Sequence, residues 1–590
     1  MSDRQSLIEA IRRQPDEDTP RLMLADWYEE NGDAARGEFI RVQCELARLD
    51  PADARYPELH VRQLQIQAEH EREWLGEWAD KLVRWEFRRG LLNEVTIEPE
   101  PYCSAGEALF RDHPIWRVAF VDDQGESLSP PAIRDVLAQP HSRHLRAIDA
   151  AACRPGEQAA AMFGGEIRTN AWLVELANAT ALDQVRELSF YGGTRGGRKS
   201  IDADDWARFC AAKHLRGLAH LDLSNRYDHH GNSAAWEPVL RVLAGATFAA
   251  ELRSLRFDGC YTAASALSHL TGGKFARLRT LTTGGPNTDL NLSRILPSLL
   301  DPSLLPELRE LTISSGKHIA ETANHSGWSR FERIGLVGTD DHWDRSPATH
   351  HPIWRAFFRS PHVRPTSFLL NSPGYYDPET VGLWDELAGA AWFGGLRELS
   401  IELYDQSCAP LVERAIENFP RVRSLTLTPC TAVVNRLAEW PGLANLVELG
   451  LDASHDTTVP DAAAKLFASP HLTPRLSRLA ASGICRSEKA VAALARCKAL
   501  EGLTHLDFAF NELTPDGAAT LATSPHLKHL RSLHTWSEWD EHDRRPWLQL
   551  ADPSALPQLR DVVVGSGTTE TAQQEFRRRF GPRLRIFADC

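Results

Sequence analysis

A short apolar phrase recurs along most of this chain and limits the folds that the chain can adopt. The phrase is an apolar residue, two others, a leucine, one other and a second apolar residue, as in "LRELTI" from Leu308 and "LTHLDF" from Leu503. We take its fourth residue as an anchor. Most anchors are 23 to 34 residues apart, and the clear ones are Leu188, Leu221, Leu255, Leu281, Leu311, Ile334, Leu399, Leu425, Leu449, Leu479, Leu506, Leu533 and Val562.

Three weaker copies extend the repeat, at Val95, Val118 and Phe368, so we expect about 15 to 18 units, with the 335–395 region least regular. Alternating apolar residues make a short strand with one buried face. One unit cannot bury that face alone, but stacked neighbours can. The spacing therefore predicts an α/β solenoid, with a parallel sheet on its concave side and helices on its convex side.

The most complete copy is "LTHLDFAFNELTPDGAATLATSPHLKHL", residues 503–530. It resembles the leucine-rich repeat family, whose pattern is L-x-x-L-x-L-x-x-[N/C]-x-L, in its ribonuclease-inhibitor-like form. The resemblance covers about residues 90–590 and implies a horseshoe. In this copy Thr514 is placed to cap the helical half, and Pro515 suits its first turn.

The asparagine or cysteine of the repeat pattern lies five residues after the anchor. Cys153, Cys260, Cys430 and Asn511 occupy this position. We expect their side chains to turn inward and satisfy backbone groups, because buried N–H and C=O groups need partners. The ten cysteines form no C-x-x-C pair, which disfavours a zinc site or a disulfide framework.

The chain begins differently, with "DEDTPRLMLADWYEENGDAARGEFIRVQ", residues 16–43. Asp18 or Thr19 with Pro20 marks the start of a helix, and Gly32 marks its end. The stretch resembles the bacterial repeat-companion domain, which commonly precedes repeat arrays and for which no catalytic activity is established. The matching residues are Pro20, Arg21, Leu22, Ala25, Asp26, Trp27, Glu29, Gly32, Asp33, Arg36, Gly37, Glu38, Phe39, Ile40, Arg41 and Gln43.

Acidic residues of this segment raise the question of paired-carboxylate chemistry. They are Asp26, Glu29, Glu30, Asp33 and Glu38, with Arg21, Arg36 and Arg41 in the same stretch. We interpret them as salt bridges and helix caps on a small helical unit, with Trp27 buried between helices. A docking motif remains the alternative, and no catalytic residue is predicted here or elsewhere.

Residues 56–89 are predicted to be helical, with Trp74, Trp78, Leu82 and Trp85 at helical spacing. We interpret these four residues as a core stripe, and an exposed partner site is the alternative. The predicted organisation is a companion domain at 1–50, a helical bridge and cap at 51–90, and the repeat array at 91–590. A cap is expected because the open end of an array exposes its core.

Charge and hydropathy exclude some classes of function. The 590 residues carry a formal net charge of −14, which argues against a general nucleic-acid binder. No apolar run reaches about 18 residues and no secretory signal is apparent, so we expect a cytoplasmic protein without a membrane span.

Polar loops between the repeats give little support for a cofactor or a metal. "GGTRGGRKS", residues 192–200, lacks the spacing of a phosphate loop. His229 with His230, and the stretch 340–352, lack further converging ligands. In the loop 534–550, Trp536, Trp539 and Trp547 lie among charges, which is typical either of a binding hot spot or of a local aromatic cluster.

The residues that flank each anchor are predicted to face the concave side. They are Glu187, Tyr191, His220, Asp222, Arg256, Asp258, Glu310, Arg333, Glu398, Glu402, Glu448, Asp452, Arg478, His505, Asp507, His534 and Trp536, and Trp539 joins them from the loop. Acidic residues outnumber arginines nine to three in this set. The excess is typical of a solvated face or of a surface that steers a basic protein partner.

These observations predict a non-catalytic scaffold that binds a protein partner through the concave face and loops. The alternative is a sensor or regulatory subunit of a bacterial signalling or defence system, in which the N-terminal domain docks a second protein. An enzyme of ubiquitin-ligase-like or GTPase-regulating type is disfavoured, because cap and repeats occupy the whole chain. The partner and the oligomeric state do not follow from the sequence.

Overall fold

A computed structural model of the chain describes residues 3–587 with internal gaps. The gaps are residues 122–127, 151–168, 191–200, 225–235, 259–263, 285–291, 316–317, 339–353, 373–380, 404–410, 414–415, 419–420, 454–459, 512, 536–548, 551, 553 and 566–569.

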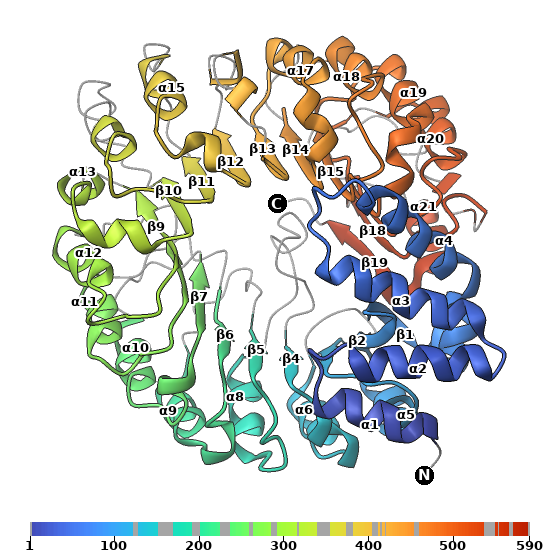
Figure 1. Ribbon diagram of the computed structural model, residues 1–590. Helices are drawn as coiled ribbons and strands as arrows, with labels where there is room; N and C mark the ends of the chain where they lie inside the picture. The colour runs from blue at the N-terminus through green and yellow to red at the C-terminus, as the bar shows by residue number, and fades with distance from the viewer. Residues whose placement is uncertain are drawn as a thin grey trace.

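One curved sheet runs through the whole repeat array, and the chain turns through almost a full circle (Figure 1). Its strands line the inner side and its helices lie outside, so the fold is a leucine-rich repeat solenoid. The parallel strands are β2 (Leu91–Ile97), β3 (Arg117–Phe120), β4 (Ala147–Asp149), β5 (Glu187–Ser189), β6 (His220–Asp222), β7 (Ser254–Asp258), β8 (Thr280–Gly284), β9 (Glu310–Ser315), β10 (Arg333–Gly338), β11 (Ser367–Ser372), β12 (Glu398–Leu403), β13 (Ser424–Leu427), β14 (Glu448–Asp452), β15 (Arg478–Ser482), β16 (His505–Asp507), β17 (Ser532–His534), β18 (Asp561–Gly565) and β19 (Leu584–Phe587).

The outer layer is built from one short helix or turn per repeat. Its α-helices are α5 (Pro99–Asp112), α6 (Pro130–Leu137), α8 (Thr169–Asn178), α9 (Ala203–Ala211), α10 (Trp236–Leu243), α11 (Ala264–Leu267), α12 (Leu292–Leu300), α13 (His318–Thr322), α15 (Val381–Ala388), α17 (Thr431–Ala438), α18 (Pro460–Phe467), α19 (Glu488–Arg496), α20 (Pro515–Ala522) and α21 (Glu570–Phe580).

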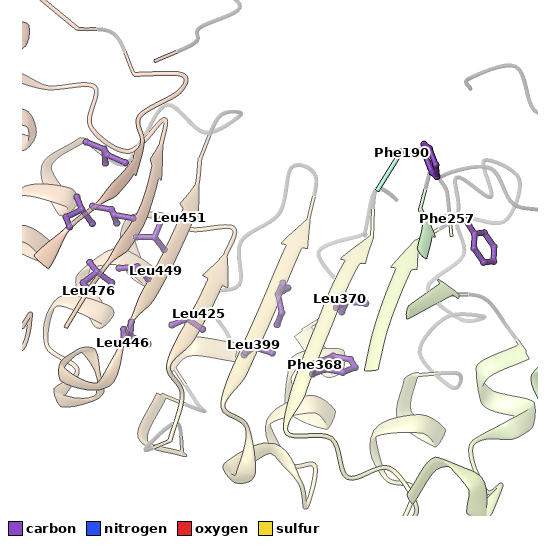
Figure 2. Packing of buried hydrophobic residues seen from close by; sticks show 14 of the residues in the cluster. Phe190, Phe257, Phe368, Leu370, Leu399, Leu425, Leu446, Leu449, Leu451 and Leu476 are labelled. Atoms are coloured by element: carbon purple, nitrogen blue, oxygen red, sulfur yellow. The ribbon is translucent and has the colours of Figure 1, made fainter. Parts of the chain in front are cut away.

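The predicted anchors stand in one register across the sheet. Leu399 pairs with Leu425 and Leu425 with Leu449, and these three side chains lie in a row under neighbouring strands (Figure 2). The weaker copies belong to the same row, because Val95 pairs with Val118 and Phe368 joins Ile334 to Leu399. All these anchors are buried in one continuous hydrophobic core. The repeat spacing is therefore confirmed, including its weak copies.

The repeat at residues 503–530 shows how local chemistry ends the strand and begins the helix. Asn511 donates from Nδ2 to the Ala481 carbonyl at 2.7 Å and accepts from the Cys485 N–H at 2.6 Å. The Thr514 hydroxyl caps α20 by accepting from the Gly517 N–H at 3.1 Å, and Pro515 begins that helix. The predictions for Asn511, Thr514 and Pro515 are confirmed.

Cys430 is the predicted cysteine that the structure describes, and it behaves differently from Asn511. Cys430 is half-buried, and its thiol does not cap α17, which begins at the next residue. Cys153 and Cys260 lie outside the described residues.

Three helices form the N-terminal unit: α1 (Asp3–Arg13), α2 (Thr19–Glu30) and α3 (Ala34–Arg48). Ile8, Leu24 and Ile40 are buried between them together with Leu91 of β2, so this unit shares packing with the first repeat. Gly32 has φ +91° after α2, as its predicted role as a helix end requires. Trp27 is only half-buried at the edge of this cluster.

Two local predictions for the N-terminal region are wrong. Asp18 does not cap α2; its buried carboxylate instead pairs with Arg48 at 2.5 Å and Arg89 at 3.1 Å. Residues 56–89 are not one helix: α4 (Tyr56–Leu75) ends just before Gly76, which has φ +55°, and β1 (Leu82–Arg88) pairs antiparallel with β2. Trp85 is buried, but it lies on β1 and not on a helix. The apolar residues 82–88 form a strand because they pair with the edge of β2.

α4 and the loop before it close the circle against the last repeats. Residues between Asp50 and Leu82 contact the turns that precede the later strands, and these contacts follow the same order along both segments. The pairs are Asp50–Arg423, the Asp53 carbonyl with Arg475, His60 with the Gly502 carbonyl, Gln67–Arg531, Glu71–Arg560, and the Leu82 carbonyl with Arg583. A Cβ on Gly502 would lie 2.0 Å from the Pro474 carbonyl oxygen and 3.0 Å from His60, so only glycine allows this approach. We call this set of contacts the closing seam.

The centre of the closing seam is a buried polar network around Glu71. Its Oε1 accepts from Arg560 at 3.0 Å, from Trp85 Nε1 at 2.7 Å and from Gln67 at 2.6 Å. Burial opposes ionisation of Glu71, but Arg560 and Arg531 with these hydrogen bonds hold the pKa of this carboxyl below its ordinary value. The Arg560 guanidinium also stacks on Trp85, 4.5 Å from the ring centre.

We expect the free energy of unfolding to fall in acid because of His60 in the closing seam. Burial lowers the pKa of His60 to about 4, while Nδ1 accepts from Gln63 and Nε2–H donates to the Gly502 carbonyl. Between about pH 6.5 and 4 the unfolded chain binds a proton that folded His60 excludes, so stability falls as pH falls, by up to about 1.4 kcal/mol per pH unit. Urea unfolding of His60→Gln at several pH values should show a shallower slope than wild type, and His471→Gln should not. An unchanged slope in His60→Gln would contradict this role.

Candidate functional site

The inner face of the sheet carries the side chains that alternate with the buried anchors. Residues before the anchors stand opposite one another on neighbouring strands: Glu187 with His220, Glu310 with Arg333, and Arg478 with both Glu448 and His505. The structure thus places on this face Glu187, His220, Asp222, Arg256, Glu310, Arg333, Glu398, Glu402, Glu448, Asp452, Arg478, His505, Asp507 and His534. Asp258 ends β7, but its side chain, Tyr191, Trp536 and Trp539 lie outside the described part of the chain.

Each arginine of the predicted set is paired with a carboxylate of that set. Arg333 lies 2.5 Å from Glu398, Arg478 lies 3.5 Å from Glu448, and Arg256 lies 3.9 Å from Asp222. Such exposed pairs stabilise the fold by about 0–1 kcal/mol each. Each pair offsets the charge of one carboxylate, so the remaining negative charge of this face lies on the carboxylates outside these three pairs.

Neutral side chains that the sequence analysis did not single out hold several of the glutamates. Hydroxyls donate across neighbouring strands, from Ser367 to Glu398 at 2.7 Å, from Ser424 to Glu448 at 3.2 Å and from Thr280 to Glu310 at 3.2 Å. The Asn371 amide donates to Glu402 at 2.9 Å. Ser367, Ser424 and Thr280 each precede an anchor by one residue, and Asn371 follows its anchor by three. These are the same positions as those of the predicted charged residues, so the repeat pattern could have identified them.

The acidic excess is concentrated on β12 and β14. Glu398 and Glu402 stand on β12, Glu448 and Asp452 on β14, and β13 between them presents Ser424 and Thr426. No arginine or lysine lies on these three strands. We call these four carboxylates the acidic patch.

Asp507 and His534 form the arrangement on this face that most resembles a catalytic pair. His534 Nδ1 lies 3.1 Å from Asp507. Burial opposes ionisation of Asp507, but His534 and the Ala509 N–H lower the pKa of this carboxyl. The neighbouring strands place Ala480 beside Asp507 and Val563 beside His534, neither of which is a nucleophile. The pair therefore fits a cross-strand structural contact better than a catalytic site.

Four of the five N-terminal carboxylates lie in the caps and ion pairs that we expected, and Glu30 is exposed at the end of α2. Arg41 binds both Asp26 and Glu29, and Asp33 caps α3 by accepting from the Arg36 N–H at 2.9 Å. Glu38 makes a two-pronged pair with Arg62 at 2.7 Å. Gly37 is required by close packing, because a Cβ there would lie 2.9 Å from the Ala25 carbonyl oxygen. This part of the motif therefore serves packing and charge pairing.

Buried cysteines lack the environment of a nucleophile. Burial raises the pKa of Cys210 to about 12 and of Cys44 to about 11, with Asp18 adding to the effect at Cys44. A reactive thiol needs a lowered pKa instead.

Metal and membrane sites find no support in the part of the chain that the structure describes. Within the described ranges, no three His, Cys, Asp or Glu side chains converge as metal ligands would. The described helices are all too short or too polar to cross a bilayer. The stretches 192–200 and 340–352, His229, His230 and Trp547 lie outside the described residues.

A column of arginines on the rim, where the strands begin, was not predicted. These arginines lie two residues before an anchor. The backbone N–H at this position donates to the carbonyl oxygen of the equivalent residue in the preceding repeat, as from Arg279 to Arg253 and from Arg309 to Arg279, both at 2.8 Å. This column includes Arg146, Arg186, Arg253, Arg279, Arg309, Arg397, Arg423, Arg531 and Arg560. Its last three members face the closing seam. Arg146 reaches the C-terminal end of α1, donating to the Arg12 carbonyl at 2.8 Å.

No family model and no curated protein matches this chain. Among solved structures, similarity is found to the complex of Rad7 and Elc1 from yeast, with 12% identity over 99% of this chain and 98% of that one, at a TM-score of 0.32. A protein from Bacteroides fragilis is 14% identical over 48% of this chain and 65% of its own, at 0.24. The leucine-rich repeat protein LegL7 from Legionella pneumophila is 13% identical over 79% of this chain and 98% of its own, at 0.20. These scores are too low to support a function for this chain. The leucine-rich repeat fold is assigned from the register of its own strands.

Proposed function

We propose that this chain is a non-catalytic scaffold that binds a protein partner along the inner face of its sheet. The observation that carries the proposal is the continuous band of polar and charged side chains on β5 to β17. Among the described residues, the helices lie on the outer side of these strands (Figure 1). Such a surface is broad and chemically varied, which suits protein recognition better than the binding of one small substrate.

Rigidity of the band supports this function. Each strand from β5 to β17 has a buried anchor below it and is hydrogen-bonded to its neighbours in the sheet. The closing seam holds the two ends of the array together. A surface that is ordered before binding loses little conformational entropy when a partner docks.

The acidic patch favours a partner with a basic surface. The patch holds four carboxylates on β12 and β14, and two of them, Glu398 and Glu448, are paired with Arg333 of β10 and Arg478 of β15. Complementary charge raises the association rate and rejects acidic competitors. The alternative, docking of a second protein on the N-terminal helices, is less well supported, because α1 and α4 are engaged with the first and last repeats.

Charge reversal in the acidic patch tests the proposal. Partners recovered by affinity purification from the native cell at low and moderate salt should be re-measured with purified components. Glu398→Lys with Glu402→Lys should weaken binding of the dominant partner at least about tenfold, because like charges then face each other across the interface. Isothermal titration calorimetry gives the Kd.

A matched control carries the same change of charge on the outer side of the array. Glu417→Lys with Glu439→Lys alters side chains that are 85% and 75% exposed near α17. This control should leave the Kd unchanged. Equal binding by both double variants would contradict the concave-face proposal, and loss of binding only on disruption of α2 would favour the N-terminal alternative.

A further inference from the structure

A cavity of about 320 Å³ lies between the N-terminal helices and the rim of the first repeats. Five arginines line it: Arg12 and Arg13 from the end of α1, Arg21 from α2, and Arg143 and Arg146 from the turn before β4. His144 and Trp116 lie in the same wall, and Glu9 supplies the one carboxylate of the lining. A cavity of this size is at the small end of ligand sites, which hold about 300–1,000 Å³.

Positive charge in this cavity exceeds negative charge by four. Glu9 is shared between Arg12 at 3.2 Å and Arg13 at 3.5 Å. The other three arginines donate to neutral acceptors: Arg21 to the Glu17 carbonyl, Arg146 to the Arg12 carbonyl, and Arg143 to His144. The negative end of α1 offsets only about half a charge.

Among these five arginines, Arg21 gives the strongest evidence for a missing anionic partner. It is 3% exposed, and its Nε has no hydrogen-bond partner among the described residues. The nearby Asp18 is already paired with Arg48 and Arg89. Burial lowers the pKa of Arg21, Arg12 and Arg146, and the nearby carboxylates, Glu9 for Arg12 and Asp16 or Asp18 for the other two, offset this effect only in part. Burying an ion without a partner is costly unless an opposite charge arrives.

We propose that this cavity binds the dianionic group of a small phosphate monoester. Guanidinium groups present paired N–H donors that match the oxygen atoms of a phosphate, and several arginines on different elements can surround one such group. A bound dianion would join α1 and α2 to the turn before β4. It would thereby fasten the N-terminal unit to the first repeats, opposite the closing seam.

Titration calorimetry and thermal unfolding of the full chain test the proposal, with inorganic phosphate and phenyl phosphate as probes and phenyl sulfate as the singly charged comparison. Phenyl phosphate should bind one site per chain, more tightly than phenyl sulfate, and should raise Tm. Arg13→Gln with Arg143→Gln changes two exposed side chains of the cavity and should raise the Kd at least about tenfold, since each loses charge-assisted hydrogen bonds.

The matched control is Arg111→Gln with Arg241→Gln, which removes two exposed charges that do not line the cavity. This control should bind phenyl phosphate as the wild type does. The proposal is overturned if phenyl phosphate shows no saturable binding below about 10 mM, or if the two double variants bind it equally. A short single-stranded oligonucleotide that binds more tightly than phenyl phosphate, with affinity rising with its length, would also overturn it in favour of a nucleic-acid surface.

Discussion

Replacing Glu71 with alanine should lower the free energy of unfolding by about 3–5 kcal/mol, because Arg560 would then remain buried without its charge partner. The side chain of Arg560 is 8% exposed, and Trp85 and Gln67 would also lose their acceptor. Urea unfolding followed by far-UV circular dichroism measures the loss. Small-angle scattering should show a larger radius of gyration if the closing seam opens before the repeats unfold.

Two further variants separate the buried pair from a general effect on α4. Glu73→Ala removes a carboxylate from the same helix that is 79% exposed, and it should change stability by less than about 0.5 kcal/mol. Glu71→Leu with Arg560→Met replaces both charges by apolar groups and should recover most of the loss. A decrease below about 1 kcal/mol in Glu71→Ala would mean that the seam does not hold the ends together in solution.

The second large effect is expected at Asn511. Asn511→Ala removes hydrogen bonds to the Ala481, Phe508 and Ala509 carbonyls and from the Cys485 N–H. Each buried polar group left without a partner costs about 1–3 kcal/mol, so we expect a total loss of about 3 kcal/mol. The same unfolding experiment measures it.

Asn511→Asp keeps the acceptor oxygen but loses the donors, so it should be destabilising by an intermediate amount. Asn324→Ala, at an exposed position, serves as the control and should be neutral. If Asn511→Ala is also neutral, the turn must find other partners for these backbone groups, and the structural role of this position is refuted.

Repeat register was predictable because its cause is local. Each anchor is fixed by a pattern within six residues, and a strand that slipped by one residue would expose its buried face. This is why even Val95, Val118 and Phe368 were placed correctly. The side chains of the inner face followed from the same alternation, although their pairing did not, because Arg333 reaches Glu398 across an intervening strand.

Failures of prediction occurred where distant parts of the chain compete for a segment. The spacing of Trp74, Trp78 and Trp85 suits a helix, yet β1 forms because the edge of β2 offers unpaired backbone groups. Asp18 has the chemistry of a helix cap, but Arg48 and Arg89 bind it more favourably, as two charge-assisted pairs. Neither outcome can be read from residues within one turn of the site.

The sequence by itself determined that this chain is a solenoid of about 15 to 18 units with a polar inner face, because one repeating local pattern defines each strand and each turn. Only the tertiary structure decided that the solenoid closes on itself and that five arginines meet in one cavity. Closure depends on small rotations summed over all the repeats, and it brings Glu71 to Arg560 across 489 residues. Arg12, Arg21 and Arg146 lie together because the three N-terminal helices pack against the first repeats. Their spacing in the sequence does not predict that contact.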